Sequence, residues 1–198
     1  MDSHLIRFQE KFLFLDFETF NLNLNCEFNL PWQVATLLIE TKKDDNGNLR
    51  NYEINRQDLH LEWDTDLKIS ADARRITGYS ETRFQEEAFK VIYELCEKCD
   101  YIVGHNVLGF DIFLLRDWYK FHGKPYKHLP FKVIDTLSFG RSLAIDSSFE
   151  KSGSSLFEFQ MKMLSVRKKG LKTSLGALGK AYGIEHDYAK LHDALVDL

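Results

Sequence analysis

The sequence predicts an α/β fold, a mixed sheet of about five strands flanked by helices. In the first third of the chain, apolar runs of strand length are joined by turn residues and show no helical period. Further along, apolar runs alternate with helical patterns, an arrangement that covers a sheet with helices. Because no repeat or linker divides the 198 residues, we expect one domain spanning 1–198.

The first expected strand covers residues 13–20 and combines an apolar run with two acidic residues. Since apolar side chains occupy both of its faces, we expect it to be buried on both. Residues two apart on a strand point to the same side, so Asp16 and Glu18 converge. Paired carboxylates at a buried strand end are costly unless neutralised, and a divalent metal ion is the usual partner. The alternative is an ordinary polar strand end.

Two further strands are expected at 34–39 and 50–55, after a polar loop over 21–30. Between them stands Asn46-Gly47, the dipeptide most typical of hairpin turns. The first three strands therefore form an antiparallel meander.

Helical patterns follow. Residues 70–77 predict a short helix stopped by Gly78, and Ser80 is the expected cap of a longer one. Strands are expected at 101–104 and 132–135, separated by a helix over 111–121. The core-facing stripe of the longer helix consists of Phe84, Ala88, Val91, Ile92 and Leu95.

The C-terminal part is harder to interpret. The serines between 147 and 155 indicate a mobile loop within 146–173, followed by a basic run. Ser174 is expected to cap a helix closed by Gly183, with apolar side chains Leu175, Leu178 and Tyr182, and a last helix begins near Leu191.

Composition excludes several classes of protein. With 44% hydrophobic and 28% charged residues, no membrane-length apolar run and no secretory pattern, we expect an intracellular, cytoplasmic protein without a membrane partner. Cys96 and Cys99 form a C-x-x-C, typical of zinc or redox sites. No second pair stands at zinc-finger spacing, so buried free thiols are favoured.

The net charge of −4 argues against coating nucleic acid by bulk electrostatics. A polyanion must then be bound by a local patch or through metal. The run 161–174 holds five basic residues and no acid, which fits phosphate contact or, alternatively, a solvated face. The five are Lys162, Arg167, Lys168, Lys169 and Lys172.

Two further stretches carry reactive groups. At the end of the strand 101–104 stand His105 and Asn106, and Asp111 opens the following helix. Asp111 alone could be an acid that complements the helix dipole. Near the end of the chain, His192 and Asp197 lie five residues apart on an expected helix, where each could also be solvated.

Taken in order, Asp-x-Glu, His-Asn-x3-Phe-Asp and a late His-x4-Asp resemble the DEDDh, or DnaQ-like, family of 3′–5′ exonucleases, which has a ribonuclease H-like fold. The start is most similar to bacterial exonuclease I. It reads Asp-Phe-Glu-Thr-Phe over 16–20, then a long loop, then Pro31-x-Gln33.

The resemblance implies a metal-dependent 3′–5′ exonuclease that releases nucleoside 5′-monophosphates. Asp16, Glu18 and Asp197 would hold one Mg²⁺ or Mn²⁺, and Asp16 would bridge to a second ion supported by Asp111. His192 would be the general base, a role that suits a pKa near 6.5. Hard oxygen ligands independently favour these ions.

The resemblance also implies substrate contacts. Thr19 and Phe20 would meet the terminal sugar and base, although Phe20 could equally be a core residue. His105 and Asn106 would touch the substrate strand or merely satisfy the strand end. The expected partner is the 3′ end of single-stranded DNA, or of RNA, with a polymerase or a further C-terminal domain as additional candidates.

Two features depart from the family. Thr19 is followed by Phe20-Asn21, where many members have Thr-Gly, and the chain stops at Leu198, directly after Asp197. We therefore expect the exonuclease part of a longer protein, or a shortened chain. The alternatives are an exoribonuclease or oligoribonuclease of the same fold, and a non-catalytic module that binds nucleic acid or acts as a scaffold.

Overall fold

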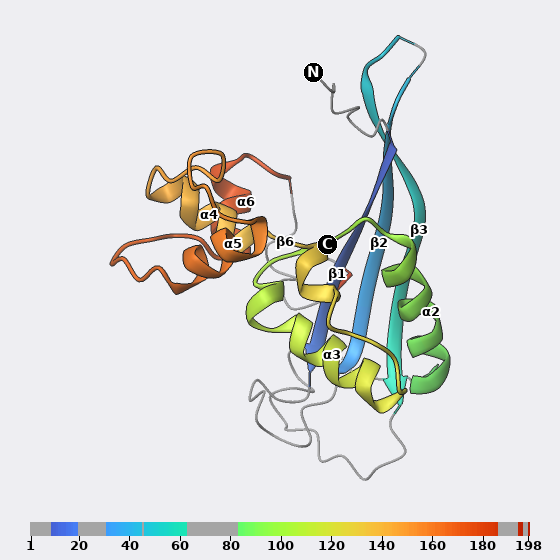
Figure 1. Cartoon of the computed structure of the whole chain (residues 1–198). Coiled ribbons are helices and arrows are strands. Elements are labelled where there is room, and N and C mark those ends of the chain that lie inside the picture. Colours follow the sequence, from blue (N-terminus) through green and yellow to red (C-terminus); the bar gives the residue numbers. More distant parts are fainter. Residues whose placement is uncertain (1–8, 20–30, 45, 63–82, 186–193, 196–197) are drawn as a thin grey trace.

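The computed structural model describes residues 9–19, 31–44, 46–62, 83–185, 194–195 and 198. Its centre is a mixed sheet with strand order β4-β3-β2-β1-β5-β6. Figure 1 shows helices α2 and α3 together against the long strands, and helices α4, α5 and α6 as a separate group beside β6. The predicted α/β architecture of a mixed sheet flanked by helices is confirmed.

Strands β1 (Gln9–Thr19), β2 (Pro31–Lys43) and β3 (Leu49–Glu62) form the predicted antiparallel meander. Asp44 stabilises the β2–β3 turn by accepting backbone hydrogen bonds from Asn46 and Asn48, and Gly47 adopts the left-handed conformation. All three strands extend beyond the apolar runs because backbone pairing continues where the side chains become polar. The predicted stretch is the buried part of β1 and β2, whereas in β3 the predicted residues 50–55 are mostly exposed and the buried residues are Leu59 and Leu61.

The two faces of β1 differ in burial. Leu13, Leu15 and Phe17 are buried, whereas the opposite face, which carries Asp16 and Glu18, is only half-buried. The prediction of burial on both faces was therefore wrong for one of them. Apolar character on both sides of a strand does not reveal how completely each side is covered.

The remaining strands are short and parallel to their neighbours. β5 (Tyr101–Gly104) pairs with β1, and β6 (Val133–Asp135) pairs with β5. Both confirm predicted strands. β4 (Arg83–Phe84) is a two-residue addition beside β3, so Phe84 belongs to a strand and not to the helical stripe predicted for it.

Helix α2 (Gln85–Lys98) begins after β4, and its predicted core residues Ala88, Ile92 and Leu95 are buried. Helix α3 (Asp111–Phe121) has the predicted bounds and buries Leu114, Leu115 and Trp118 as expected. Short 3₁₀ turns, η1 (Val107–Gly109) and η2 (Leu129–Lys132), precede α3 and β6.

Two helices were not predicted. They are α4 (Thr136–Ala144) and α5 (Leu156–Ser165), and α5 lies inside the stretch 146–173 that was expected to contain a mobile loop. The last of the serines between 147 and 155, Ser155, caps α5 in a reciprocal capping box with Glu158. Serine is common both in loops and at helix starts, which is why the prediction failed here.

Helix α5 also completes the edge of the sheet. The side chain of Gln160 is fully buried, accepts a hydrogen bond from Asp135 N–H and donates one to Val133 O. It thus pairs with β6 much as a neighbouring strand would. An amide on a helix takes the place of a further strand at this edge.

Helix α6 (Leu175–Ala181) begins, as predicted, after Ser174, whose hydroxyl accepts from Ala177 N–H. Tyr182, one of the apolar side chains expected on this helix, is its C-cap residue and is 63% exposed. The predicted loop 21–30, the helix 70–77, the Ser80 cap and the helix near Leu191 lie outside the described residues. Among the helices described, none is long and apolar enough to cross a membrane.

Gly104 is needed where β5 approaches β1. A Cβ atom there would lie 2.7 Å from Leu15 O and 2.5 Å from Val107 Cγ2. We expect Gly104→Ala to lower the free energy of unfolding by about 2 kcal/mol, because the added methyl group would push against the backbone carbonyl of Leu15, which is held in the sheet. Urea unfolding would measure the change.

Gly140→Ala is the matched control. The added Cβ would meet only the end of the Leu178 side chain, which can move. A gain of about 1 kcal/mol in helix propensity offsets that displacement, so stability should hardly change. Equal losses in both variants would contradict the proposed role of Gly104.

Candidate active site at the end of strand β1

Asp16 and Glu18 project from one face of β1 close to its end, as predicted from their spacing. Asp16 lies opposite Ala35 of β2, and Glu18 lies opposite Gln33. The register breaks directly after Glu18, so regular pairing ends there. Both carboxylates are half-buried.

Asp111, far away in sequence, joins this strand end. It is the first residue of α3 and is only 3% exposed. Its Oδ1 accepts a 3.1 Å hydrogen bond from the backbone N–H of Phe17, the residue between Asp16 and Glu18. The structure therefore brings the Asp111 carboxyl group to the backbone of the first acidic pair. A helix-dipole role alone would not require that contact.

The turn from β5 into α3 fixes the position of Asp111. Asn106 has a left-handed backbone, with φ of 65°, and precedes η1. Asp135 holds this turn by accepting hydrogen bonds from Asn106 N–H at 3.1 Å and Leu108 N–H at 2.9 Å. The same carboxylate caps α4 through Leu137 N–H and Ser138 N–H.

Sequence reasoning missed Asp135 as a positioning residue. Its signal was present, because an acidic residue after the apolar pair Val133-Ile134 follows the same pattern as Asp16 after Leu15. Asp135 is fully buried and its oxygens are occupied by backbone N–H groups. It therefore supports the site and is not itself available to a ligand.

The electrostatics of the site favour a cation. Burial raises the pKa of Asp111 well above the usual range, and the nearby charge of Asp16 raises it further. Burial also raises the pKa of Asp135, although its backbone hydrogen bonds oppose this effect. A buried carboxyl group beside a second carboxylate is stabilised by a bound positive charge, and hard oxygen donors suit Mg²⁺ or Mn²⁺.

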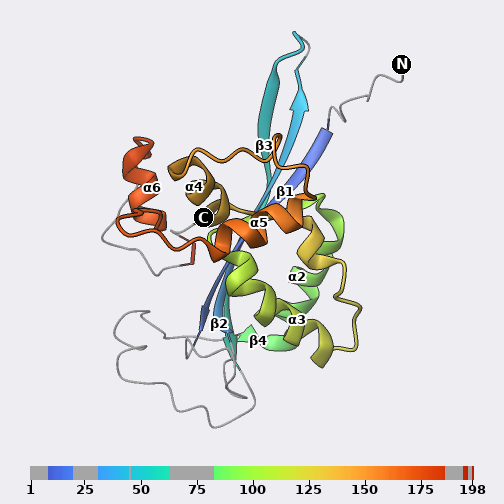
Figure 2. The same ribbon diagram turned by 60° about the vertical axis from the view of Figure 1, so that its left-hand side comes forward.

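Two members of the predicted set, His192 and Asp197, lie outside the described residues. Within the described part, no group of three or more His, Cys, Asp or Glu side chains is arranged to hold a metal ion. Between the two, Ala194 is described and fully buried. In Figures 1 and 2 the C-terminal end of the chain lies between β1 and the α4–α6 group.

Three of the four predicted substrate residues, Thr19, His105 and Asn106, lie at or directly after the ends of β1 and β5. Thr19 ends β1, and Phe20 lies outside the described residues. Thr136 Oγ1 donates to Gly104 O at 3.1 Å, so its oxygen is left to accept from His105 Nδ1 at 3.1 Å. This chain of hydrogen bonds requires a proton on Nδ1 of His105.

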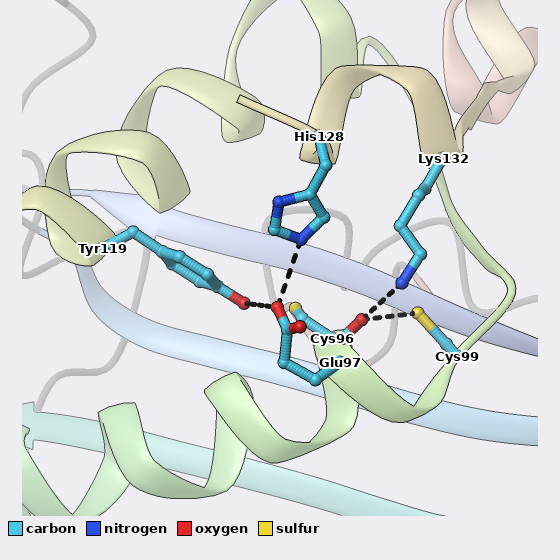
Figure 3. A network of polar contacts seen from close by, with 6 residues as sticks. All are labelled: Cys96, Glu97, Cys99, Tyr119, His128 and Lys132. Carbon is cyan, nitrogen blue, oxygen red and sulfur yellow. Dashed lines mark hydrogen bonds and ion pairs between the residues drawn. The ribbon is translucent and has the colours of Figure 1, made fainter. Parts of the chain in front are cut away.

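The C-x-x-C pair lies elsewhere, at the end of α2, and Figure 3 shows its surroundings. Cys96 and Cys99 are buried free thiols, as predicted. Burial raises the pKa of Cys99 to about 11 and that of Cys96 further still. Both thiols therefore stay protonated near neutral pH. Cys99 Sγ and Lys132 Nζ donate to the same acceptor, Cys96 O.

Glu97 completes this network. Its Oε1 accepts from Tyr119 Oη at 3.4 Å and lies 3.2 Å from His128 Nε2 (Figure 3). These contacts join α2 to α3 and to the segment before η2. The network therefore stabilises the packing of the helices and lies apart from the acidic strand end.

Comparisons with solved structures bear on the acidic site. The E. coli exonuclease I complex with a dT13 oligonucleotide matches with a TM-score of 0.65 and 20% identity, over 95% of this chain and 38% of that one. The zinc-bound E. coli ExoI–ssDNA complex matches with a TM-score of 0.66 and 20% identity, over 95% of this chain and 38% of that one. The ExoI/SSB-Ct complex matches with a TM-score of 0.65 and 20% identity, over 96% of this chain and 38% of that one.

These matches show that the chain has the α/β fold of the matched part of exonuclease I. The chain spans less than two fifths of the length of that enzyme. No protein-family model matches the sequence, and a search of curated proteins finds no match.

The raised pKa of Asp111 predicts a pH dependence of stability. Since the folded state binds a proton more tightly than the unfolded state, the free energy of unfolding falls as the pH rises from about 4 through the folded pKa. With divalent cations removed, Asp111→Asn should therefore be more stable than the wild type near neutral pH. The gain is about 1.4 kcal/mol per unit of pKa shift and vanishes near pH 4.

Denaturant unfolding in EDTA across this pH range measures the difference. Asp117→Asn is the control, because Asp117 lies on the same helix but is exposed and paired with Arg116. A wild type as stable as Asp111→Asn near neutral pH would contradict the electrostatic description of the site.

Proposed function

We propose that this chain is a metal-dependent 3′–5′ exonuclease acting on single-stranded nucleic acid ends, with DNA favoured over RNA. The observation that carries the proposal is the hydrogen bond from Phe17 N–H to Asp111 Oδ1, which joins a carboxyl group of α3 to the backbone between Asp16 and Glu18. The fold shared with exonuclease I, a protein solved with single-stranded oligonucleotides, supports the same activity.

The acidic residues would bind divalent cations. Asp16, Glu18 and Asp197 would hold one Mg²⁺ or Mn²⁺, and Asp111 would support a second ion shared with Asp16. Bound there, the two ions would stabilise the charge that develops on the phosphodiester oxygens during hydrolysis. The half-buried strand face and the raised pKa of Asp111 fit this role, because both make a cation favourable at neutral pH.

His192 would act as general base and take the proton of the attacking water. A histidine titrates close to neutral pH, so the neutral form that accepts a proton is well populated there. Attack on the terminal phosphodiester would release a nucleoside 5′-monophosphate. The full burial of Ala194, two residues after His192, supports a C-terminal segment that packs against the rest of the domain.

The terminal nucleotide would lie beside the end of β1. Thr19 would contact its sugar, Phe20 would stack on its base, and His105 and Asn106 would meet the strand from the end of β5. The hydrogen bond to Thr136 fixes the orientation of the His105 ring at the end of β5, which supports a defined contact there.

The activity can be tested on two 5′-labelled single-stranded oligonucleotides, one of DNA and one of RNA, with Mg²⁺ or with EDTA. We expect a ladder that shortens from the 3′ end only when the metal is present, with DNA degraded faster. Asp16→Ala should reduce the rate by about 10³-fold or more, because it removes ligands worth several kcal/mol in the transition state.

Asp117→Ala serves as the matched control, since it removes an exposed carboxylate from α3 without touching the acidic strand end. Its rate should match that of the wild type. Faster degradation of RNA would favour the alternative hypothesis that the chain is an exoribonuclease. Binding of both substrates without any shortening would overturn the proposed catalysis and favour a non-catalytic nucleic-acid-binding module.

A further inference from the structure

The segment between α5 and α6 concentrates positive charge. We define the basic loop as residues 166–173, together with Lys162 in the last turn of α5. It holds five basic residues and no acid, in a chain whose net charge is −4. All five side chains are exposed. Positive charge is therefore segregated here and not mixed with negative charge, as it is on an ordinary solvated surface.

Hydrogen bonds fix the start of the basic loop, and burial fixes its end. Val166 N–H donates to Met163 O at 3.1 Å, and the Arg167 guanidinium donates to Leu164 O at 2.8 Å. Arg141 of α4 donates to the same carbonyl. At the other end Thr173 is buried and precedes the cap of α6. The loop thus displays its charges from a defined backbone.

The basic side chains have no acidic partner in the part of the chain that the structure describes. Elsewhere Arg50, Arg56 and Arg116 each form an ion pair with a carboxylate. In the basic loop, Arg167 contacts only the backbone carbonyls of Leu164 and Val166. Unpaired, exposed charges of one sign attract a polyanion, and releasing its counterions contributes to binding.

The position of the loop decides which part of a polyanion it can meet. In both views it lies at the outer end of the α4–α6 group, away from the long strands that carry Asp16 and Glu18 (Figures 1 and 2). A strand whose terminal nucleotide sits at the end of β1 can reach the loop only with nucleotides further from its 3′ end.

We propose that the basic loop binds the backbone phosphates of a single-stranded nucleic acid upstream of the terminal nucleotide. This inference rests on the proposed function, because the acidic strand end fixes where the 3′ terminus would lie. The loop then adds affinity for long substrates without taking part in hydrolysis. A substrate without upstream phosphates would gain nothing from the loop.

The test is binding of fluorescein-labelled oligothymidylate, measured by anisotropy in EDTA so that no cleavage is required. For Lys168→Gln/Lys169→Gln, affinity for a chain of about 20 nucleotides should fall about tenfold. The slope of log K against log salt should become shallower by about 1.4, since each single-strand phosphate contact contributes about 0.7. Binding of a labelled trinucleotide should not change.

Lys90→Gln/Lys127→Gln is the matched control, because it removes the same charge from two other exposed lysines. It should retain most of the wild-type affinity and slope. If both double variants give the same slope, the loop makes no specific phosphate contact and the inference is wrong; an acidic protein segment then becomes the better candidate partner.

Failure of the proposed function is distinguishable from failure of this inference. A shallower slope for the loop variant, with no degradation by the wild type in Mg²⁺, would support the loop as a binding surface and overturn the exonuclease. Degradation by the wild type in Mg²⁺, together with an unchanged slope for the loop variant, would support the exonuclease and overturn the loop as a binding surface. A wild type that does not bind the long oligonucleotide would overturn the loop proposal.

Discussion

The hydrogen bond between Phe17 N–H and Asp111 Oδ1 is the interaction on which the candidate site depends. It joins a strand at the start of the chain to a helix that begins 94 residues later. It is buried, and the carboxyl group that accepts it loses most of its contact with water. Such a group is stable at neutral pH when a backbone donor and a nearby cation compensate for the lost solvation. This one hydrogen bond therefore holds the start of α3 against β1 and also places a buried carboxyl group beside Asp16.

Periodicity predicted the elements whose burial is one-sided and regular. Helix α3 has the predicted bounds because its apolar side and its closing Gly123 are unambiguous. The hairpin was predicted from Asn46-Gly47, and in the structure Gly47 has the positive φ that favours glycine in such turns. Asp16, Glu18 and Asp111 could be named in advance because each places a charge where an apolar strand ends or a helix begins. Their convergence at one point depends on strand order, which the residues alone do not specify.

The elements that were missed have a different origin. Helix α5 depends on Ser155 acting as a cap, and the same residue type is equally at home in a loop. Asp135 works through its contacts with the backbone of Asn106 and Leu108, which are more than 25 residues away along the chain. Gln160 completes the sheet from a helix, a role that no local pattern indicates. Tertiary partners determine these positions, and a sequence pattern reports only local preference.

The carboxylate of Asp135 has a consequence for how the domain opens. One side chain holds both the turn before α3 and the first turn of α4, so a displacement of Asp135 would leave N–H groups of both segments without their acceptor. We therefore expect the two segments to lose their order together when Asp135 detaches from them. A change in the α4–α6 group that moves Asp135 would in this way also move Asp111 away from the end of β1.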